Sequence, residues 1–330
     1  MEKINSHPLP RWADPNVQIP IVVSACLLGQ QVRYDGDHRR DSFLVRVLSQ
    51  WVEWRPVCPE VELGLGVPRP TIQLEQHPEG IRLRQPETGL DLTERMQRFV
   101  AARVQQPDLQ QVCGAILKAR SPSCGVRRVK LLDPSGQQVG WTQGFFAAAL
   151  VRAFPFLPVE EDEHLHDGVR RHNWVRRVVC LHRLQRLCEG PWTYDDLLQF
   201  HQAHRWILSV HHPAALIDLD SLVAHAEEKS QEELQQAYTQ HFLRALSRPA
   251  TRPRHVRVLR KFLEMVSEGG DPILRRETLE AIEGYHRGQI PLVVPVTFVR
   301  AYLRHSASPE LAETLYLNPH PMELKMAYTV

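Results

Sequence analysis

The chain has 330 residues, which is enough for two domains of ordinary size. Its 43% hydrophobic and 24% charged residues are typical of a folded protein and exclude a chain that is disordered throughout. The net charge of +2 neither requires nor excludes a nucleic-acid partner.

Residues 1–18 are interpreted as an N-terminal extension, and a strand–helix alternation follows over 19–160. Short apolar runs rich in β-branched residues predict buried strands, and helical spacing of apolar residues predicts the helices between them. The predicted strands cover 19–25, 52–57 and 112–119, a predicted hairpin covers 72–85, and the predicted helices cover 41–51, 93–105 and 144–154. This alternation predicts an α/β domain with three layers and a mainly parallel, Rossmann-like sheet.

An acidic stretch at residues 161–168 is interpreted as a linker, because the sequence pattern changes after it. Residues 169–330 show helical periodicity almost throughout, which predicts an all-α C-terminal domain. No apolar run approaches the about 18 residues of a membrane-spanning helix, so we expect no membrane partner. The N-terminus lacks the apolar core of a secretory signal, and we therefore expect a cytoplasmic protein.

Three of the six cysteines, Cys26, Cys58 and Cys124, each follow a predicted strand. In open α/β sheets ligands bind at the carboxyl ends of the strands, so three separate loops could bring these thiols to one point. Cys113 differs because it stands at the start of its strand, and it is interpreted as structural. Disulfides are not expected in a cytoplasmic chain.

Three interpretations of these thiols remain open from the residues alone. Each cysteine could be a small buried hydrophobe, or the set could bind zinc, or it could bind an iron–sulfur cluster. Zinc sites usually show close cysteine pairs, which this chain lacks, whereas a cluster accepts ligands from distant loops. Glu60 and Ser121 stand near the thiols in the sequence and could transfer protons. The alternative interpretation is that Glu60 is an ordinary surface acid and Ser121 an ordinary turn residue.

Two basic patterns in the helical half could contact a phosphate backbone. The first is a stripe along one face of a predicted helix, and the second is a cluster further along the chain. The stripe contains Arg176, Arg183 and Arg186, and the cluster contains Arg252, Arg254, Arg257 and Lys261. Charged helix surfaces that only face solvent produce the same pattern.

The motifs of residues 20–150 together resemble the thiouracil desulfidase (TudS) family. They are Ser24-Ala25-Cys26-Leu27-Leu28-Gly29, Val32-Arg33-Tyr34-Asp35-Gly36, Cys58-Pro59-Glu60 and Ser121-Pro122-Ser123-Cys124-Gly125. The helical half carries Phe200-His201, His211-His212-Pro213 and Leu317-Asn318-Pro319-His320-Pro321, and with these motifs it resembles YbgA-type domains. The combination of both halves is similar to the tRNA 4-thiouridine desulfidases. One departure is the run Val61–Arg69, which keeps a Pro-Arg pair but alters the glycine pair that single-domain members carry. That change fits a substrate other than free thiouracil.

The resemblance implies a [4Fe–4S] cluster held by Cys26, Cys58 and Cys124, with Glu60 and Ser121 in catalysis. It implies that sulfur is removed from 4-thiouridine in tRNA without net redox change. In that scheme the thiocarbonyl sulfur binds the open iron of the cluster, Glu60 activates water, Ser121 assists proton transfer, and uridine and hydrogen sulfide are released. The pocket residues expected in addition are Arg33, Asp35 and Arg69.

Two alternatives to this function remain open. The domain could act on free thiouracil-type bases, with the helical half serving only stability or dimerisation. The chain could instead be a non-catalytic iron–sulfur regulator that binds nucleic acid. A sensor needs no general acid or base, so the presence of Glu60 and Ser121 beside the thiols favours an enzyme.

Overall fold

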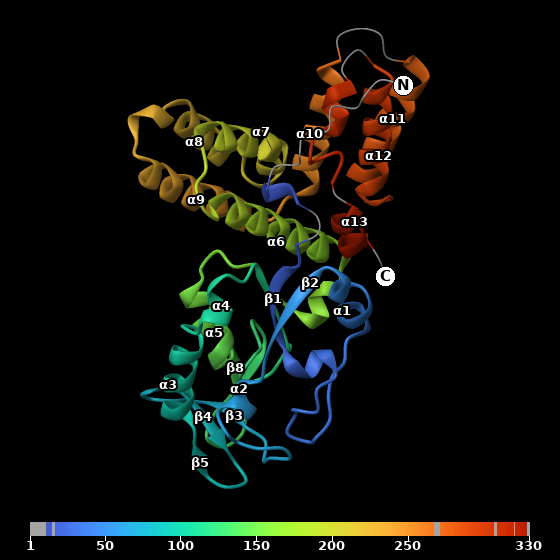
Figure 1. Ribbon diagram of the computed structural model, residues 1–330. Helices are drawn as coiled ribbons and strands as arrows, with labels where there is room; N and C mark the ends of the chain where they lie inside the picture. The colour runs from blue at the N-terminus through green and yellow to red at the C-terminus, as the bar shows by residue number, and fades with distance from the viewer. Residues whose placement is uncertain (1–10, 15–16, 267–270, 307–308, 320, 329–330) are drawn as a thin grey trace. The chain divides into compact units, whose positions relative to one another are not determined.

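The computed structural model describes residues 11–14, 17–266, 271–306, 309–319 and 321–328. Most of the expected extension 1–18 lies outside these residues. The chain forms two compact units, which we call the sheet unit and the helical unit. The sheet unit comprises the described residues within 15–182 and 325–330, and the helical unit those within 1–14 and 183–324. The α/β domain followed by an all-α domain is confirmed (Figure 1).

Sheet A of the sheet unit has four parallel strands in the order β2-β1-β6-β9. They are β1 (Ile19–Ser24), β2 (Val52–Val57), β6 (Gly114–Leu117) and β9 (Val159–Glu161). In β1, five of six residues are buried, and β6 is buried throughout. A strand covered on both faces reads as an unbroken apolar run, which is why the sequence located these two strands.

Sheet B has five strands in the order β5-β4-β3-β7-β8 and mixes parallel and antiparallel pairs. They are β3 (Gln73–His77), β4 (Gly80–Gln85), β5 (Leu90–Asp91), β7 (Val129–Leu132) and β8 (Gln138–Thr142). The single mainly parallel sheet expected from the sequence is therefore two sheets. The hairpin β3–β4 was predicted correctly, but its parallel pairing with β7 joins segments too distant for local patterns to indicate.

Short helices connect the strands of the sheet unit, and their bounds follow. They are η2 (Ala25–Leu28), α1 (Ser42–Arg46), η3 (Leu48–Gln50), α2 (Pro59–Glu62), α3 (Thr93–Arg103), α4 (Pro107–Gln110), α5 (Phe145–Ala153) and η4 (Asp162–His166). Asp41 caps α1 by accepting hydrogen bonds from the backbone N–H groups of Phe43 and Leu44. The predicted linker 161–168 contains the last residue of β9, all of η4 and the first residue of α6 (Gly168–Cys188).

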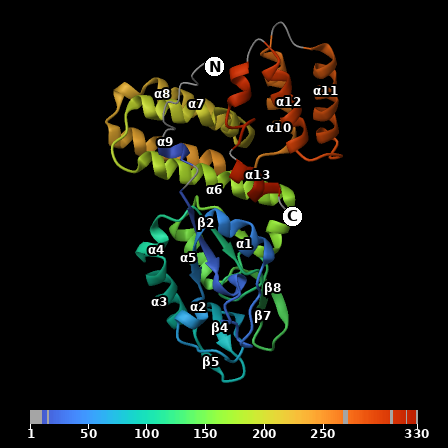
Figure 2. The same cartoon turned by 45° about the vertical axis from the view of Figure 1, so that its right-hand side comes forward.

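The helical unit consists of helices joined by short connections (Figures 1 and 2). They are η1 (Arg11–Ala13), α7 (Tyr194–His211), α8 (Pro213–Ala224), η5 (Ala226–Glu228), α9 (Gln231–Ser247), α10 (Arg252–Glu264), α11 (Pro272–His286), α12 (Val293–Arg304) and η6 (Pro309–Glu313). The last helix, α13 (Pro321–Tyr328), is divided between the two units after residue 324. Capping boxes start α7 at Thr193 and α9 at Ser230. Phe200, Tyr238 and Phe242 are fully buried between α7 and α9. In the described part of the chain no helix has the length and apolar content to cross a bilayer.

Candidate functional site

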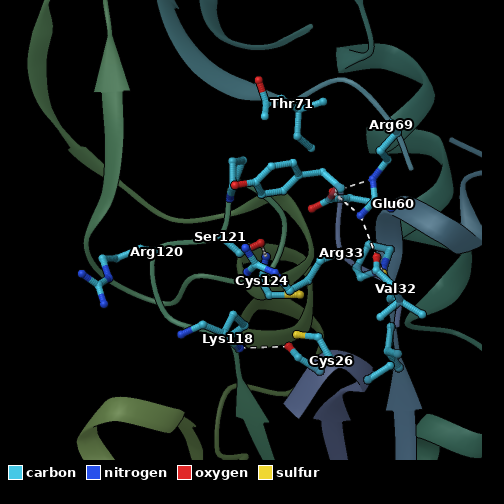
Figure 3. Close-up of a pocket in the computed structure, with 18 of the residues that line it drawn as sticks. Cys26, Val32, Arg33, Glu60, Arg69, Thr71, Lys118, Arg120, Ser121 and Cys124 are labelled. Atoms are coloured by element: carbon cyan, nitrogen blue, oxygen red, sulfur yellow. Dashed lines mark hydrogen bonds and ion pairs between the residues drawn. The ribbon is translucent and has the colours of Figure 1, made fainter. Parts of the chain in front are cut away.

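The three cysteines that follow predicted strands come together at one edge of sheet A. Cys26 lies in η2 directly after β1, Cys58 lies directly after β2, and Cys124 lies in the loop that follows β6. The parallel registers pair the last residues of β1 and β2, so these strands end at the same level. All three cysteines line one cavity of about 250 Å³. In Figure 3 the sulfur atoms of Cys26 and Cys124 point into the same space.

The environment of the thiols keeps them protonated as free groups. Burial and the nearby Cys58 raise the pKa of Cys26 to about 11, although Lys118 and Arg33 act in the opposite direction. Burial raises the pKa of Cys58, and it raises that of Cys124 further, well above the usual value. Thiols of this kind ionise when a metal takes the place of the proton.

The donor set of this cavity fits an iron–sulfur cluster better than a single ion. Among the described residues no three histidine, cysteine, aspartate or glutamate side chains are arranged to hold one metal ion. In a cluster each cysteine binds a different iron, so the ligands stand farther apart than the ligands of one zinc ion. The cavity is lined by three thiols from separate loops, of which Cys26 and Cys124 are buried and Cys58 is half-buried, and soft sulfur ligands are those that such clusters use.

Glu60 is held in one orientation by two partners. Arg69 donates to its Oε2 atom from Nε at 3.0 Å and from Nη2 at 2.7 Å. The Ser123 hydroxyl donates to its Oε1 atom at 3.0 Å. Arg69 is only 7% exposed and also donates to the carbonyl oxygens of Gly66 and Val32, so it acts as a fixed clamp. Figure 3 shows this pair beside the cavity.

The Ser121 hydroxyl acts only as an acceptor within its own turn. Its Oγ atom accepts hydrogen bonds from the backbone N–H groups of Ser123 at 3.2 Å and Cys124 at 3.1 Å. A hydroxyl that accepts two bonds keeps its proton for a further partner. Ser121 lines the cavity, so that partner can be a bound molecule.

The first turn of α5 fixes the loop that carries Ser121 and Cys124. The backbone N–H groups of Phe145 and Phe146 donate to the carbonyl oxygens of Pro122 and Ser123. Gly144 allows this close approach, because a Cβ atom there would lie 2.6 Å from the Ser123 carbonyl. The serine and the thiol are thus positioned by a helix end rather than by a free loop.

Two of the three expected pocket residues line the cavity, and the third supports one of them. Arg33 and Arg69 line it, whereas Asp35 binds Arg33 through both carboxylate oxygens, at 3.2 and 3.1 Å. This hydrogen bonding by Arg33 lowers the pKa of Asp35. The Arg33 guanidinium also lies 5.2 Å from the centre of the Tyr34 ring. Tyr34 lines the cavity and is 42% exposed.

Two basic residues that precede Ser121 also belong to the site, although no sequence motif identified them. Lys118 and Arg120 line the cavity wall (Figure 3). Lys118 forms an ion pair with Asp162 at 2.7 Å, and its backbone N–H donates to the Ser24 hydroxyl at 2.9 Å. Arg120 has φ +63°, a left-handed conformation that is strained for a residue with a side chain. Their position directly after β6 could have identified them, because the loops that follow parallel strands line such sites.

The predicted cationic stripe on α6 is not exposed as expected. Arg176 and Arg183 are only 8% and 6% exposed. Arg183 forms an ion pair with Glu323 of α13 at 2.6 Å, and Arg186 pairs with Glu189 at 2.6 Å. A side chain that is buried in this way cannot reach a phosphate backbone. The exposed cationic surface predicted for α6 is therefore wrong for Arg176 and Arg183.

The cluster on α10 is largely exposed. Arg252, Arg257 and Lys261 are exposed, whereas Arg254 is half-buried and donates to the carbonyl oxygen of His211 at 2.6 Å. Apolar residues of the same helix are buried on its other side. α10 therefore combines an apolar packed face with a cationic free face.

Comparison with known proteins gives separate matches for the two halves of the chain. Residues 21–162 match a family described as 2-thiouracil desulfurase, and residues 205–321 match DUF1722, described as a protein of unknown function. The Uncharacterized protein YbgA of Escherichia coli (strain K12) is 27% identical over 128 residues, which is 38% of this chain and 76% of that protein. The Uncharacterized protein YbbK of Bacillus subtilis (strain 168) is 28% identical over 148 residues, 43% of this chain and 96% of that protein. The solved structure of a [4Fe-4S]-dependent thiouracil desulfidase TudS is 33% identical, covering 46% of this chain and 95% of that chain, with a TM-score of 0.36.

Proposed function

The chain belongs, through its sheet unit, to the 2-thiouracil desulfurase family, and we propose that it removes sulfur from 4-thiouridine in tRNA. The observation that carries this proposal is the composition of one small cavity. It joins three thiols, a clamped carboxylate and a serine hydroxyl at the carboxyl edge of a parallel sheet. The products are uridine and hydrogen sulfide, and water supplies the oxygen that replaces the sulfur.

Cys26, Cys58 and Cys124 would hold a [4Fe–4S] cluster in this cavity. A cluster with three protein ligands supplies one iron that can act as a Lewis acid toward a soft sulfur atom. Replacement of a thiocarbonyl sulfur by oxygen is a hydrolysis, so the reaction needs neither an oxidant nor a reductant.

The other residues of the cavity supply orientation and proton transfer. Glu60 accepts a proton from the attacking water, and Arg69 and Ser123 hold its carboxylate so that it need not reorganise. The Ser121 hydroxyl donates to the ring atom or sulfur on which negative charge develops. Both protons of the water leave with the sulfur as hydrogen sulfide: Glu60 returns the proton it took, and the proton of the added hydroxyl follows when the C=O bond forms and the C–S bond breaks. Atoms and charge therefore balance.

The dimensions of the cavity support a substrate whose base leaves the RNA stack. About 250 Å³ is at or below the small end of ligand pockets, which hold about 300–1,000 Å³. Enzymes that act on a base within a folded nucleic acid extrude it into such a pocket. We assign the exposed cations Arg252, Arg257 and Lys261 of α10 to contacts with the tRNA backbone.

Nucleoside mass spectrometry after incubation of 4-thiouridine-containing tRNA with anaerobically reconstituted protein tests this function. We expect conversion to uridine with release of sulfide, and no conversion by Cys26→Ala. Glu60→Gln preserves the shape of the side chain and leaves the three cysteines unaltered. This variant should therefore bind the cluster but lose most of its turnover. Absence of conversion by protein that carries its cluster would contradict the proposal.

Desulfidation of free thiouracil-type bases is the second candidate, and the family description favours it. A ratio of kcat/KM for tRNA to kcat/KM for the free base separates the two. A ratio well above one supports the tRNA substrate, and a ratio well below one supports the free base. Cluster-dependent binding of nucleic acid without turnover of either substrate would instead indicate a regulator.

A further inference from the structure

The hairpin β7–β8 presents an exposed surface of aromatic and basic side chains. Trp141 is 49% exposed and Val139 is 54% exposed, and both belong to β8. Lys130 of β7 is the register partner of Trp141, and the Arg128 guanidinium lies 5.3 Å from the centre of the indole ring. We call Arg128, Lys130, Val139 and Trp141 the hairpin face.

The hairpin face is exposed although the other side of sheet B is packed. The opposite side of the sheet is apolar, with Leu74, Leu83 and Val129 buried, and α3 packs on that sheet through buried Met96 and Val100. In the view of Figure 2 the hairpin and α3 lie on different sides of the sheet unit. Sheet B therefore has a packed side, and its other side is exposed at the β7–β8 hairpin, where the indole has no role in the core.

The charge of the hairpin face indicates an anionic partner. Arg127 forms an ion pair with Glu160 at 3.4 Å, whereas in the described residues neither Arg128 nor Lys130 forms one. A flat sheet surface that joins an exposed aromatic ring to free cations is how many proteins bind single-stranded nucleic acid, by base stacking and phosphate contacts.

The hairpin face is also close to the cavity along the chain. Arg128 follows Cys124 by four residues, so their Cα atoms lie within about 14 Å of each other. Thr71 and Ile72, which line the cavity, lead directly into β3, and β3 pairs with β7. A second exposed ring, Tyr34, lines the cavity itself and also has an arginine beside it.

We propose that the hairpin face binds the RNA strand that flanks the base in the cavity, with a neighbouring base stacked on Trp141 and phosphates held by Arg128 and Lys130. This inference rests on the proposed function and extends it. It places RNA contacts on the catalytic unit itself, in addition to those assigned to α10. The sheet unit then recognises more of its substrate than the thiolated base.

Direct binding and turnover together test this proposal. The measurements are fluorescence anisotropy with 4-thiouridine-containing tRNA and steady-state turnover of a free thiolated base, both with full-length reconstituted protein. We expect Trp141→Ala to raise the Kd for tRNA about tenfold, because one stacked base is lost, and Trp141→Phe to retain most of the affinity. Arg128→Ala/Lys130→Ala should make the salt dependence shallower by about two phosphate contacts. Turnover of the free base should not change in any of these variants.

The matched control removes two exposed arginines elsewhere on the sheet unit, Arg46→Ala/Arg98→Ala, and should leave the Kd for tRNA and its salt dependence unchanged. An unchanged Kd in both hairpin variants overturns the inference, whereas tRNA conversion in the same preparations still supports the proposed function. Weaker tRNA binding without any tRNA conversion supports the hairpin face and overturns the proposed activity. A Trp141→Ala variant that shifts from dimer to monomer in light scattering, with unchanged tRNA affinity, identifies the face as a contact between copies and overturns the inference.

Discussion

The helices α6 and α10 carry similar arginine-rich patterns, but the structure uses them in different ways. Arg183 of α6 is buried against Glu323, whereas Arg252, Arg257 and Lys261 of α10 remain exposed. The sheet unit shows the same difference between a buried arginine and an exposed one. Arg69 is buried against Glu60 at the cavity, and Arg128 is exposed beside Trp141 on the hairpin face. A run of arginines therefore indicates a binding surface only when no other segment of the chain covers it.

The largest effect that this comparison predicts is on stability. Arg183→Ala should lower the free energy of unfolding by about 3–5 kcal/mol, because it leaves the buried Glu323 carboxylate without this ion pair. Lys261→Ala breaks an exposed pair with Glu264 at 3.6 Å and should cost less than about 1 kcal/mol. Urea unfolding of both variants measures the difference. Equal losses would show that burial does not separate the two helices.

The next effect is on catalysis. Arg69→Ala should lower kcat by about 10- to 100-fold, as the loss of a residue that orients a functional group does. It removes both hydrogen bonds that the guanidinium donates to Glu60, so the loss should appear in kcat more than in KM for tRNA. Steady-state kinetics with Arg98→Ala as the exposed control measures this. A raised KM with unchanged kcat would assign Arg69 to substrate binding instead.

A smaller effect concerns the exposed cations of α10. The triple variant Arg252→Ala/Arg257→Ala/Lys261→Ala should bind tRNA more weakly, and the slope of its salt dependence should fall by about three contacts. The control variant Arg46→Ala/Arg98→Ala/Lys229→Ala removes the same charge from other exposed positions. If both triple variants bind alike, only the net charge of the protein matters and α10 has no special role.

The smallest effect concerns the half-exposed pair Arg33–Asp35 at the cavity. Arg33 lowers the pKa of Asp35 in the folded protein below the value of about 3.9 in an unfolded chain. The pair therefore stabilises the fold above that pH, and the stabilisation is lost as the pH falls through the lower folded value. Unfolding of the unaltered protein and of Arg33→Ala should differ more at pH 7 than at pH 3. An equal difference at both pH values would exclude this linkage.

Local sequence patterns were sufficient for several features of the molecule. The strands β1 and β6 were predictable because a strand buried on both faces is an apolar run. The positions of Cys26, Cys58 and Cys124 after three strands predicted that their loops could converge, and these residues do line one cavity. The start of α1 after Asp41 was predictable because a cap acts within one turn, but the single helix predicted over 41–51 is divided into α1 and η3. The change from alternating elements to helices marked the two fold classes.

Only the tertiary structure decided how segments distant in the chain pair with one another. The pairing of β3 with β7 creates a second sheet, and with it a free face that carries Trp141. The tertiary structure likewise decided which ion pairs form between distant residues. These are Arg69 with Glu60, Lys118 with Asp162 and Arg183 with Glu323. Periodicity reports which side of an element is apolar, because that is a property of neighbouring residues. Which other segment covers a charged side chain depends on packing across the whole chain, and no local pattern contains that information.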